Sequence, residues 1–255
     1  MSATTAATGT WVRRFHPAPE APVRLLCLPH SGGSASYFHP LSRALSPALD
    51  VLTVQYPGRG DRRGEPFVTD VREMADRLFA ELQERPDPRP LALFGHSLGA
   101  TVGFELALRL EAAGTAPLAL FASSRRAPST HREGEYANIE DDDWVLSTVK
   151  ELGGTPQELL VDEKLLRMNL PVLRADYRAA QGYRYRPGPA LACPVVAMIG
   201  QTDSKVSLQE AAAWRTHTTA ETTFHWFPGG HFYLNTRVPE VATLLRTRLL
   251  PATAG

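Results

Sequence analysis

Short apolar runs, each followed by a turn and a stretch with helical spacing, recur along this chain and constrain its fold more than any other feature. Six runs are candidate strands: residues 23–29, 51–57, 91–95, 118–124, 195–200 and 222–227. Their residues are apolar at successive rather than alternate positions, which is typical of strands buried on both faces of a parallel sheet. The alternation with helical stretches therefore predicts an α/β fold, with a mostly parallel central sheet flanked by helices.

One interval interrupts the alternation. Between residues 125 and 188 no strand pattern occurs, whereas three stretches have helical spacing: 141–154, 155–160 and 163–183, the last interrupted at Pro171. We interpret approximately 125–188 as a helical lid inserted between two core strands. The whole chain, 1–255, has a length suited to one domain, and its small, polar tails, 1–10 and 251–255, are expected to be disordered.

Composition excludes several classes of protein. The chain has 27 basic and 27 acidic residues, so no net charge attracts it to nucleic acid or to an anionic membrane. Its N-terminus lacks the basic and apolar segments of a secretion signal, and no apolar stretch is long enough to cross a bilayer, so we expect a cytoplasmic protein. Cys27 and Cys193 lie in or beside apolar runs, and we expect both to be buried, with no disulfide and no metal site.

Ser97 lies in Gly95-His96-Ser97-Leu98-Gly99, directly after a predicted strand and before a predicted helix. This G-x-S-x-G pattern is typical of a sharp strand-to-helix turn that exposes a nucleophilic serine, and its glycines let the flanking elements pack closely. The unpaired N–H groups at the helix N-terminus favour negative charge beside the nucleophile. Ser97 is therefore the candidate nucleophile, and the Leu98 N–H is a candidate oxyanion donor.

A serine nucleophile needs an oriented base, and two residues follow in the order expected for one. Asp203 comes just after the predicted strand 195–200, and His231 follows the last predicted strand in a loop loosened by two glycines. Taken singly, Asp203 is equally explained as a turn residue and His231 as a loop histidine, but together with Ser97 they make a triad. His96 is expected to be a packing or hydrogen-bonding neighbour of the nucleophile, and His217 and His225 lie on a predicted helix and a predicted strand rather than on a catalytic-side loop.

The loop in "LPHSGGSASYF", residues 28–38, joins the first predicted strand to a helix and is rich in glycine. Such a loop supplies the second oxyanion donor in serine hydrolases of this kind. An ordinary Gly-rich turn is the alternative interpretation.

Six stretches together resemble the stand-alone type II thioesterases that accompany polyketide and nonribosomal peptide synthases, which have the α/β-hydrolase fold. They are "LPHSGGSASYF", "VQYPGRGDRRGEP", "FGHSLGA", "LPVLRADYRAAQGYRY", "GQTDSKV" and "FPGGHFYL", and the likeness extends from about Phe15 to Leu250. It implies a triad of Ser97, Asp203 and His231, with the oxyanion bound by the N–H groups of Ser31 and Leu98. Ser31 stands where alanine is common in the family, with little expected effect, since the backbone N–H acts.

The resemblance also implies the reaction: hydrolytic removal of stalled or wrong acyl groups from the phosphopantetheine arm of acyl or peptidyl carrier domains. The chain would need no cofactor of its own, because that arm belongs to the carrier. The sequence itself demands no more than a monomer, and the oligomeric state stays open. Lid side chains that would line the acyl chamber, unless they only pack the lid onto the core, are Met168, Leu170, Leu173 and Tyr177. Arginines that would contact an acidic carrier or the arm's phosphate, unless they are simply solvated, are Arg59, Arg62, Arg63, Arg174, Arg178 and Arg184.

Two alternatives stay open at this point. The same triad would serve a serine esterase or acyltransferase with other substrates. A scaffold of the same fold that binds a carrier without catalysis is the second alternative.

Overall fold

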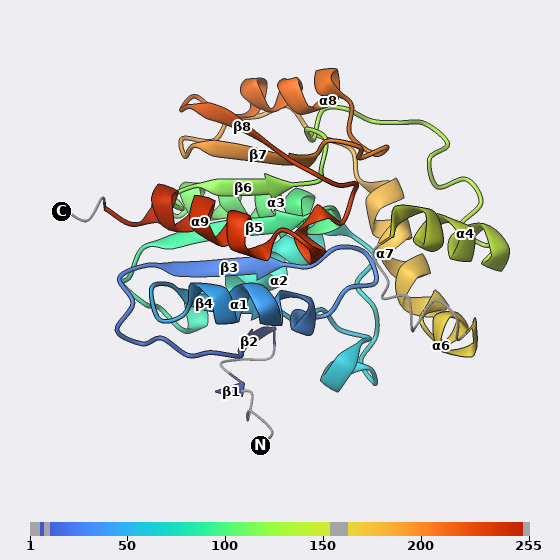
Figure 1. The fold of residues 1–255 in the computed structure, drawn as a ribbon, viewed down its shortest axis with the longest axis horizontal. Helices are drawn as coiled ribbons and strands as arrows, with labels where there is room; N and C mark the ends of the chain where they lie inside the picture. Colours follow the sequence, from blue (N-terminus) through green and yellow to red (C-terminus); the bar gives the residue numbers. More distant parts are fainter. Residues whose placement is uncertain (1–5, 8–10, 154–162, 252–255) are drawn as a thin grey trace.

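The computed structural model describes residues 6–7, 11–153 and 163–251, and in these it forms one eight-stranded sheet (Figure 1). The spatial order of the strands is β1-β2-β4-β3-β5-β6-β7-β8. From β4 across to β8 all neighbours are parallel, whereas β2 is antiparallel to β4 and β1 to β2. The strand bounds are β1 Ala6–Ala7, β2 Val12–Arg14, β3 Arg24–Leu28, β4 Asp50–Val54, β5 Leu91–His96, β6 Leu120–Ser123, β7 Val195–Gly200 and β8 Thr222–Phe227.

This arrangement confirms the mostly parallel sheet and all six predicted strands. It adds two short strands that the sequence analysis missed, because β1 and β2 are too short to show a hydrophobic pattern. Ala6–Ala7 form β1 within the N-terminal tail that was expected to be disordered, so that expectation was wrong for these two residues. Two parts of that tail, residues 1–5 and 8–10, lie outside the described residues, as do residues 252–255.

Helices cover both faces of the sheet, which explains why its strands are apolar at successive positions. Leu26 and Leu28 belong to the apolar cluster shared with α2, α3 and α8, whereas Leu25 and Cys27 belong to the cluster shared with α1 and α9. Figure 1 shows α1 and α9 in front of the strands and α2 and α3 behind them. The helix bounds are α1 His39–Leu45, α2 Val71–Glu84, α3 Leu98–Ala112, α8 Leu208–Ala212 and α9 Val238–Leu249, with short 3-10 helices at Ala35–Phe38, Gly60–Arg62, Ala213–His217 and Tyr233–Asn235.

The inserted helices, for which we keep the name lid, lie beside the sheet, on the right in Figure 1. They are α4 Asp142–Leu152, α6 Glu163–Met168 and α7 Leu170–Gly182. The predicted break occurs at Asn169, so Pro171 lies in the first turn of α7, where a proline is tolerated because no N–H is needed there. The helix expected at 155–160 lies outside the described residues. In the ranges the structure describes, no helix has both the length and the apolar character to span a bilayer.

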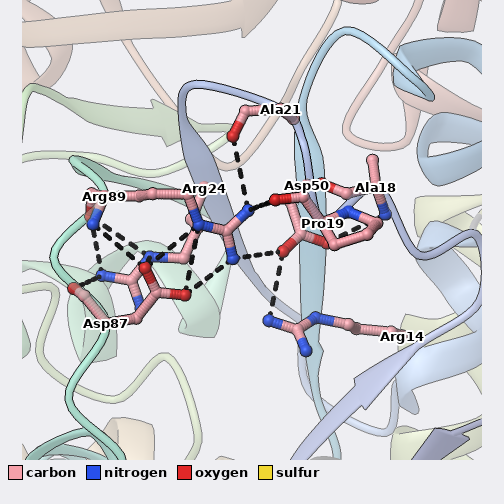
Figure 2. Close-up of polar contacts among 8 residues, drawn as sticks. All are labelled: Arg14, Ala18, Pro19, Ala21, Arg24, Asp50, Asp87 and Arg89. Atoms are coloured by element: carbon pink, nitrogen blue, oxygen red, sulfur yellow. Dashed lines mark hydrogen bonds and ion pairs between the residues drawn. The ribbon is translucent and has the colours of Figure 1, made fainter.

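At the amino ends of the strands, five charged residues form a cluster that ties the N-terminal segment to the sheet (Figure 2). Asp50, whose side chain is only 1% exposed, forms ion pairs with Arg89 at 3.0 Å and with Arg14 at 3.1 Å. Arg24 and Arg89 both pair with Asp87. Arg89 also donates to the carbonyl oxygens of Ala18, Pro19 and Ala21. We call these five residues, Arg14, Arg24, Asp50, Asp87 and Arg89, the amino-edge cluster.

Candidate active site

Ser97 occupies a strained turn between β5 and α3. Its φ of +53° and ψ of −118° place it in a region that non-glycine residues rarely adopt. A Cβ on Gly95 would lie 2.3 Å from the carbonyl oxygen of Gly99, and one on Gly99 would lie 2.0 Å from that of Leu28. Only glycine fits at either place, because any side chain would collide with backbone. The turn therefore has the local geometry predicted from the G-x-S-x-G pattern.

The backbone around Ser97 leaves two donors available. The Ser97 N–H donates to the carbonyl of Ser123 at the end of the neighbouring strand β6, at 2.8 Å, which fixes the turn. Within the described residues, the N–H groups of Leu98, the first residue of α3, and of Ser31 have no acceptor. Ser31 and Ser97 line the same cavity. A helix N-terminus with a free N–H favours a developing negative charge.

Asp203 and His231 lie together at the carboxyl ends of β7 and β8. His231 Nδ1 is 3.0 Å from both carboxylate oxygens of Asp203, and the two side chains are 5% and 0% exposed. A Cβ on Gly200 would lie 2.1 Å from the Gly230 carbonyl oxygen, so the two loops touch directly. Because Nδ1–H donates to the carboxylate, the Nε2 atom is left as the basic nitrogen of the ring.

Buried aromatic rings and histidines surround this pair. The His96 ring is 5.5 Å from that of His231, and its Nδ1 lies 2.8 Å from the Ser123 hydroxyl, which in turn lies 2.7 Å from the Tyr233 hydroxyl. Burial, with the nearby His231 and His30, holds the pKa of His96 well below its usual value, so its ring is neutral. His96 therefore acts as a hydrogen-bonding neighbour, in keeping with the sequence analysis.

The remaining histidines singled out in the sequence do not line the cavity. His217 Nε2 lies 2.8 Å from the Ser129 hydroxyl, and burial lowers the pKa of His217 to about 4. His225 lies on β8, where its Nε2 is 3.5 Å from an Arg248 nitrogen. No group of three or more His, Cys, Asp or Glu side chains in the described ranges is arranged to hold a metal ion.

A cavity of about 470 Å³ joins Ser97 and His231 to the lid. Of the four lid side chains expected to line it, Leu173 and Tyr177 do, whereas Leu170 is buried in the apolar cluster of the lid. Met168 is outside the cavity and 68% exposed, because it ends α6 where the chain turns at Asn169. Lining residues that the sequence analysis missed come mainly from α4 and α6: Trp144, Thr148, Val149, Leu152 and Leu166. The three- and four-residue spacing of the apolar positions in α4 was the available signal.

Two of the six arginines proposed for carrier or phosphate contacts are buried, so that interpretation was wrong for them. The side chains of Arg59 and Arg62 are each 5% exposed. Arg62 pairs with Glu65 and lies over the Trp11 ring at 4.8 Å, while Arg59 pairs with Asp176. Sequence alone does not show when an arginine has a buried partner. The other four have exposed or half-exposed positions: Arg63, Arg174, Arg178 and Arg184.

The chain matches known proteins over almost its whole length. A family model described as a thioesterase domain matches residues 23–249. The thioesterase PikA5 of Streptomyces venezuelae is 46% identical over 244 residues, covering 95% of this chain and 86% of that protein. BorB, a type II thioesterase from the borrelidin biosynthetic cluster, superposes with a TM-score of 0.89 at 46% identity, covering 96% of this chain and 99% of BorB.

A second solved structure agrees at lower identity. The RedJ thioesterase from the prodiginine pathway of Streptomyces coelicolor has a TM-score of 0.85 at 34% identity, covering 96% of this chain and 90% of RedJ. The strained serine turn, the Asp203–His231 pair and these likenesses lead to one assignment. This chain belongs to the thioesterase family and has its α/β-hydrolase fold.

Proposed function

We propose that this protein is a type II thioesterase that hydrolyses acyl groups from the phosphopantetheine arm of carrier domains in polyketide or nonribosomal peptide synthesis. The observation that carries the proposal is one cavity lined by both Ser97 and His231, with His231 hydrogen-bonded to the buried Asp203. Its relatives BorB and RedJ come from biosynthetic clusters or pathways for borrelidin and prodiginine, which supports this substrate class.

In the first half of the reaction, Ser97 Oγ attacks the thioester carbonyl and its proton passes to His231 Nε2. Asp203 stabilises the resulting imidazolium through Nδ1–H. The carbonyl oxygen becomes an oxyanion, and the N–H groups of Ser31 and Leu98 donate to it. When the tetrahedral intermediate collapses, the C–S bond breaks and His231 returns the proton to the departing pantetheine thiol.

In the second half, a water molecule attacks the acyl-serine ester. His231 takes the water's proton, and the oxyanion forms again at the same donors. On collapse the C–Oγ bond breaks, His231 gives its proton to Ser97 Oγ, and the carboxylic acid is released. Leu173 and Tyr177 from the lid, with Trp144 and Leu166, give the cavity an apolar wall that suits an acyl chain.

The test is release of acyl groups from an acyl-loaded carrier protein, followed by intact mass. Wild type should remove the acyl mass, and Ser97→Ala should lower kcat by a factor on the order of 10⁶. Ser147→Ala, at an exposed position on α4, is the matched control and should behave as wild type.

Two outcomes would overturn the proposal. Binding of the loaded carrier without release of its acyl group by wild type would favour a non-catalytic scaffold. Faster hydrolysis of oxygen esters than of pantetheine thioesters with the same acyl chain would favour a general esterase.

A further inference from the structure

A buried ion pair joins the lid to the core directly beside the proposed oxyanion donor. Asp176, on α7, is 0% exposed and accepts hydrogen bonds from Arg59 Nη1 at 2.5 Å and Nη2 at 2.7 Å. The same carboxylate accepts the backbone N–H of Gly32 at 2.7 Å. Gly32 follows Ser31, in the loop of residues 29–34 that joins β3 to the 3-10 helix at Ala35–Phe38. We call this segment the Ser31 loop.

The Ser31 loop contains a tight turn that needs this support. The Gly33 N–H donates to the His30 carbonyl at 2.9 Å, so Ser31 and Gly32 are the two central residues of a turn, and Gly32 has a φ of +79°. This φ at the second central position is typical of a type II turn. The peptide between Ser31 and Gly32 is held at its N–H by Asp176, which restricts the orientation of the adjoining Ser31 backbone.

A second contact from α7 reaches the same glycine. A Cβ on Gly32 would lie 2.5 Å from Leu173 Cδ2, so glycine at this place lets α7 approach closely. Leu173 and Asp176 are three residues apart and therefore share one face of the helix. That face contacts the turn by packing at Leu173 and by a hydrogen bond at Asp176.

Two core side chains hold the other parts of the loop. Arg59 Nη1 donates to the Gly33 carbonyl at 3.3 Å. Gln55 accepts the Ala35 N–H at 2.7 Å and donates to the Arg59 carbonyl at 2.9 Å, both in buried surroundings. The loop thus has hydrogen bonds to the lid through Asp176 and to the core through Arg59, while Gln55 holds Ala35, the first residue after the loop, and the Arg59 backbone.

We infer that Asp176 and Arg59 are positioning residues for the oxyanion hole, through which the docked lid fixes the Ser31 N–H for the transition state. The inference rests on the proposed function, because it concerns how that reaction's oxyanion is bound. Displacement of a catalytic donor by about 1 Å costs roughly 100-fold in rate, comparable with losing an oxyanion donor. Loss of the Asp176 bond to Gly32 should therefore lower kcat about 100-fold.

The experiment separates positioning from folding. Asp176→Asn removes the charge and leaves Arg59 buried without its partner, so it tests the pair but can also impair folding. The double variant Asp176→Leu with Arg59→Met replaces the pair by apolar side chains of similar size, an exchange that buried ion pairs often tolerate. Leu146→Ala is the control, because Leu146 is buried in the apolar cluster of the lid but does not line the cavity.

Two ligands distinguish the transition state from simple binding. A trifluoromethyl ketone analogue of the acyl thioester forms a tetrahedral adduct with Ser97 and places an oxyanion at the two donors. An S-alkyl pantetheine of the same length lacks the thioester carbonyl, so it forms no oxyanion and reports only on binding of the arm and chain. For the double variant we expect kcat and the ketone affinity to fall by about 100-fold, with KM and the S-alkyl affinity within about threefold of wild type. Leu146→Ala should lower Tm and leave kcat within about threefold.

Wild-type kcat in a folded double variant, or equal weakening of both ligands, would overturn the inference. If Asp176→Asn does not fold, the double variant gives the answer. Failure of the proposed function is recognised separately, since wild type would then not hydrolyse acyl-pantetheine. The ketone adduct depends on Ser97 and the oxyanion donors whatever the natural substrate is, so it still tests the positioning role.

Discussion

Two buried aspartates at opposite edges of the sheet have similar arginine partners but different neighbours. Asp50, in the amino-edge cluster, pairs with Arg14 and Arg89 and is 1% exposed (Figure 2). Asp176 pairs with Arg59 beyond the carboxyl ends of the strands and is 0% exposed. The cluster around Asp50 holds the carbonyl groups of the N-terminal segment, whereas Asp176 holds the N–H of Gly32 beside the candidate nucleophile.

The comparison shows that a buried ion pair has no fixed role. Its Coulombic attraction is largely offset by the cost of removing two charges from water, so its presence is weak evidence for added stability. What the pair holds in place decides its effect. At the amino edge it orders a chain segment, and at the carboxyl edge it orders a loop that lines the cavity.

A third buried carboxylate, Asp203, belongs to the candidate triad, and its substitution should change kcat more than a substitution at Asp50 or Asp176. Asp203→Asn should lower kcat by about 10⁴-fold, because the amide no longer orients His231 in the tautomer that leaves Nε2 basic. The unfolding free energy should change much less than kcat does. Single-turnover hydrolysis of an acyl-pantetheine, with urea unfolding of the same sample, measures both. A variant with nearly normal kcat would remove Asp203 from the triad.

Asp50→Asn is the matching change at the amino edge. It leaves Arg14 and Arg89 without their shared buried carboxylate, and breaking such a pair costs about 3–5 kcal/mol of unfolding free energy. The kcat of the folded protein should equal that of wild type. Asp61→Asn is the control, because Asp61 also pairs with an arginine, Arg13, but is 59% exposed and should cost less than about 1 kcal/mol.

Chemical denaturation and kcat, measured on the same preparations, check this prediction. If Asp50→Asn lowered kcat without lowering stability, the two edges of the sheet would not differ in the way proposed.

The sheet and the serine turn could be predicted because their signals are local. Buried parallel strands are continuous apolar runs, and the Gly95–Gly99 turn has a fixed spacing between a strand and a helix. β2 was not predicted, since a three-residue strand is too short to show a pattern. The interruption expected at Pro171 lies instead at Asn169, and Pro171 belongs to the first turn of α7.

The contacts between the lid and the core could not be predicted, because they join residues far apart in the chain. Nothing near Arg59 in sequence indicates that its partner is Asp176, so a surface role was the natural interpretation of that arginine. Likewise, Met168 and Leu173 are both apolar residues of the lid, and only the turn at Asn169 directs one outward and the other to the cavity.

The pH dependence of stability should separate the two edges again. At the amino edge, the hydrogen bond from Arg89 lowers the pKa of Asp87 to about 2. The ionised Asp87 therefore stabilises the fold above the usual aspartate pKa, and this stabilisation is lost only as the pH falls from that range toward 2. At the carboxyl edge, burial keeps His96 neutral well below pH 6.5, whereas the unfolded chain binds a proton there. Between pH 6.5 and the lowered pKa of folded His96, stability should therefore fall as the pH falls, by up to about 1.4 kcal/mol per pH unit.

Urea unfolding of wild type and His96→Asn at pH 6.5, 5.5 and 4.5 measures this contribution as a difference. The variant lacks the titrating ring, so its stability should fall less steeply over that range. If the stability of both proteins fell equally with pH, His96 would be protonated in the folded state as readily as in the unfolded chain. The proposed difference in pH dependence between the two edges would then be wrong.

The smallest effect is expected within the lid itself, at Met168. Because this side chain is 68% exposed and outside the cavity, Met168→Ala should change the unfolding free energy by less than about 0.5 kcal/mol and kcat/KM by less than about twofold. Leu173→Ala removes packing on Gly32 and cavity wall together, and should cost about 2 kcal/mol or more. Thermal unfolding and hydrolysis of acyl-pantetheines of several chain lengths test both variants. If Met168→Ala and Leu173→Ala changed the chain-length preference equally, an exposed lid side chain would affect the substrate as much as one in the cavity. The contact of α7 with the Ser31 loop would then have no particular importance for the reaction.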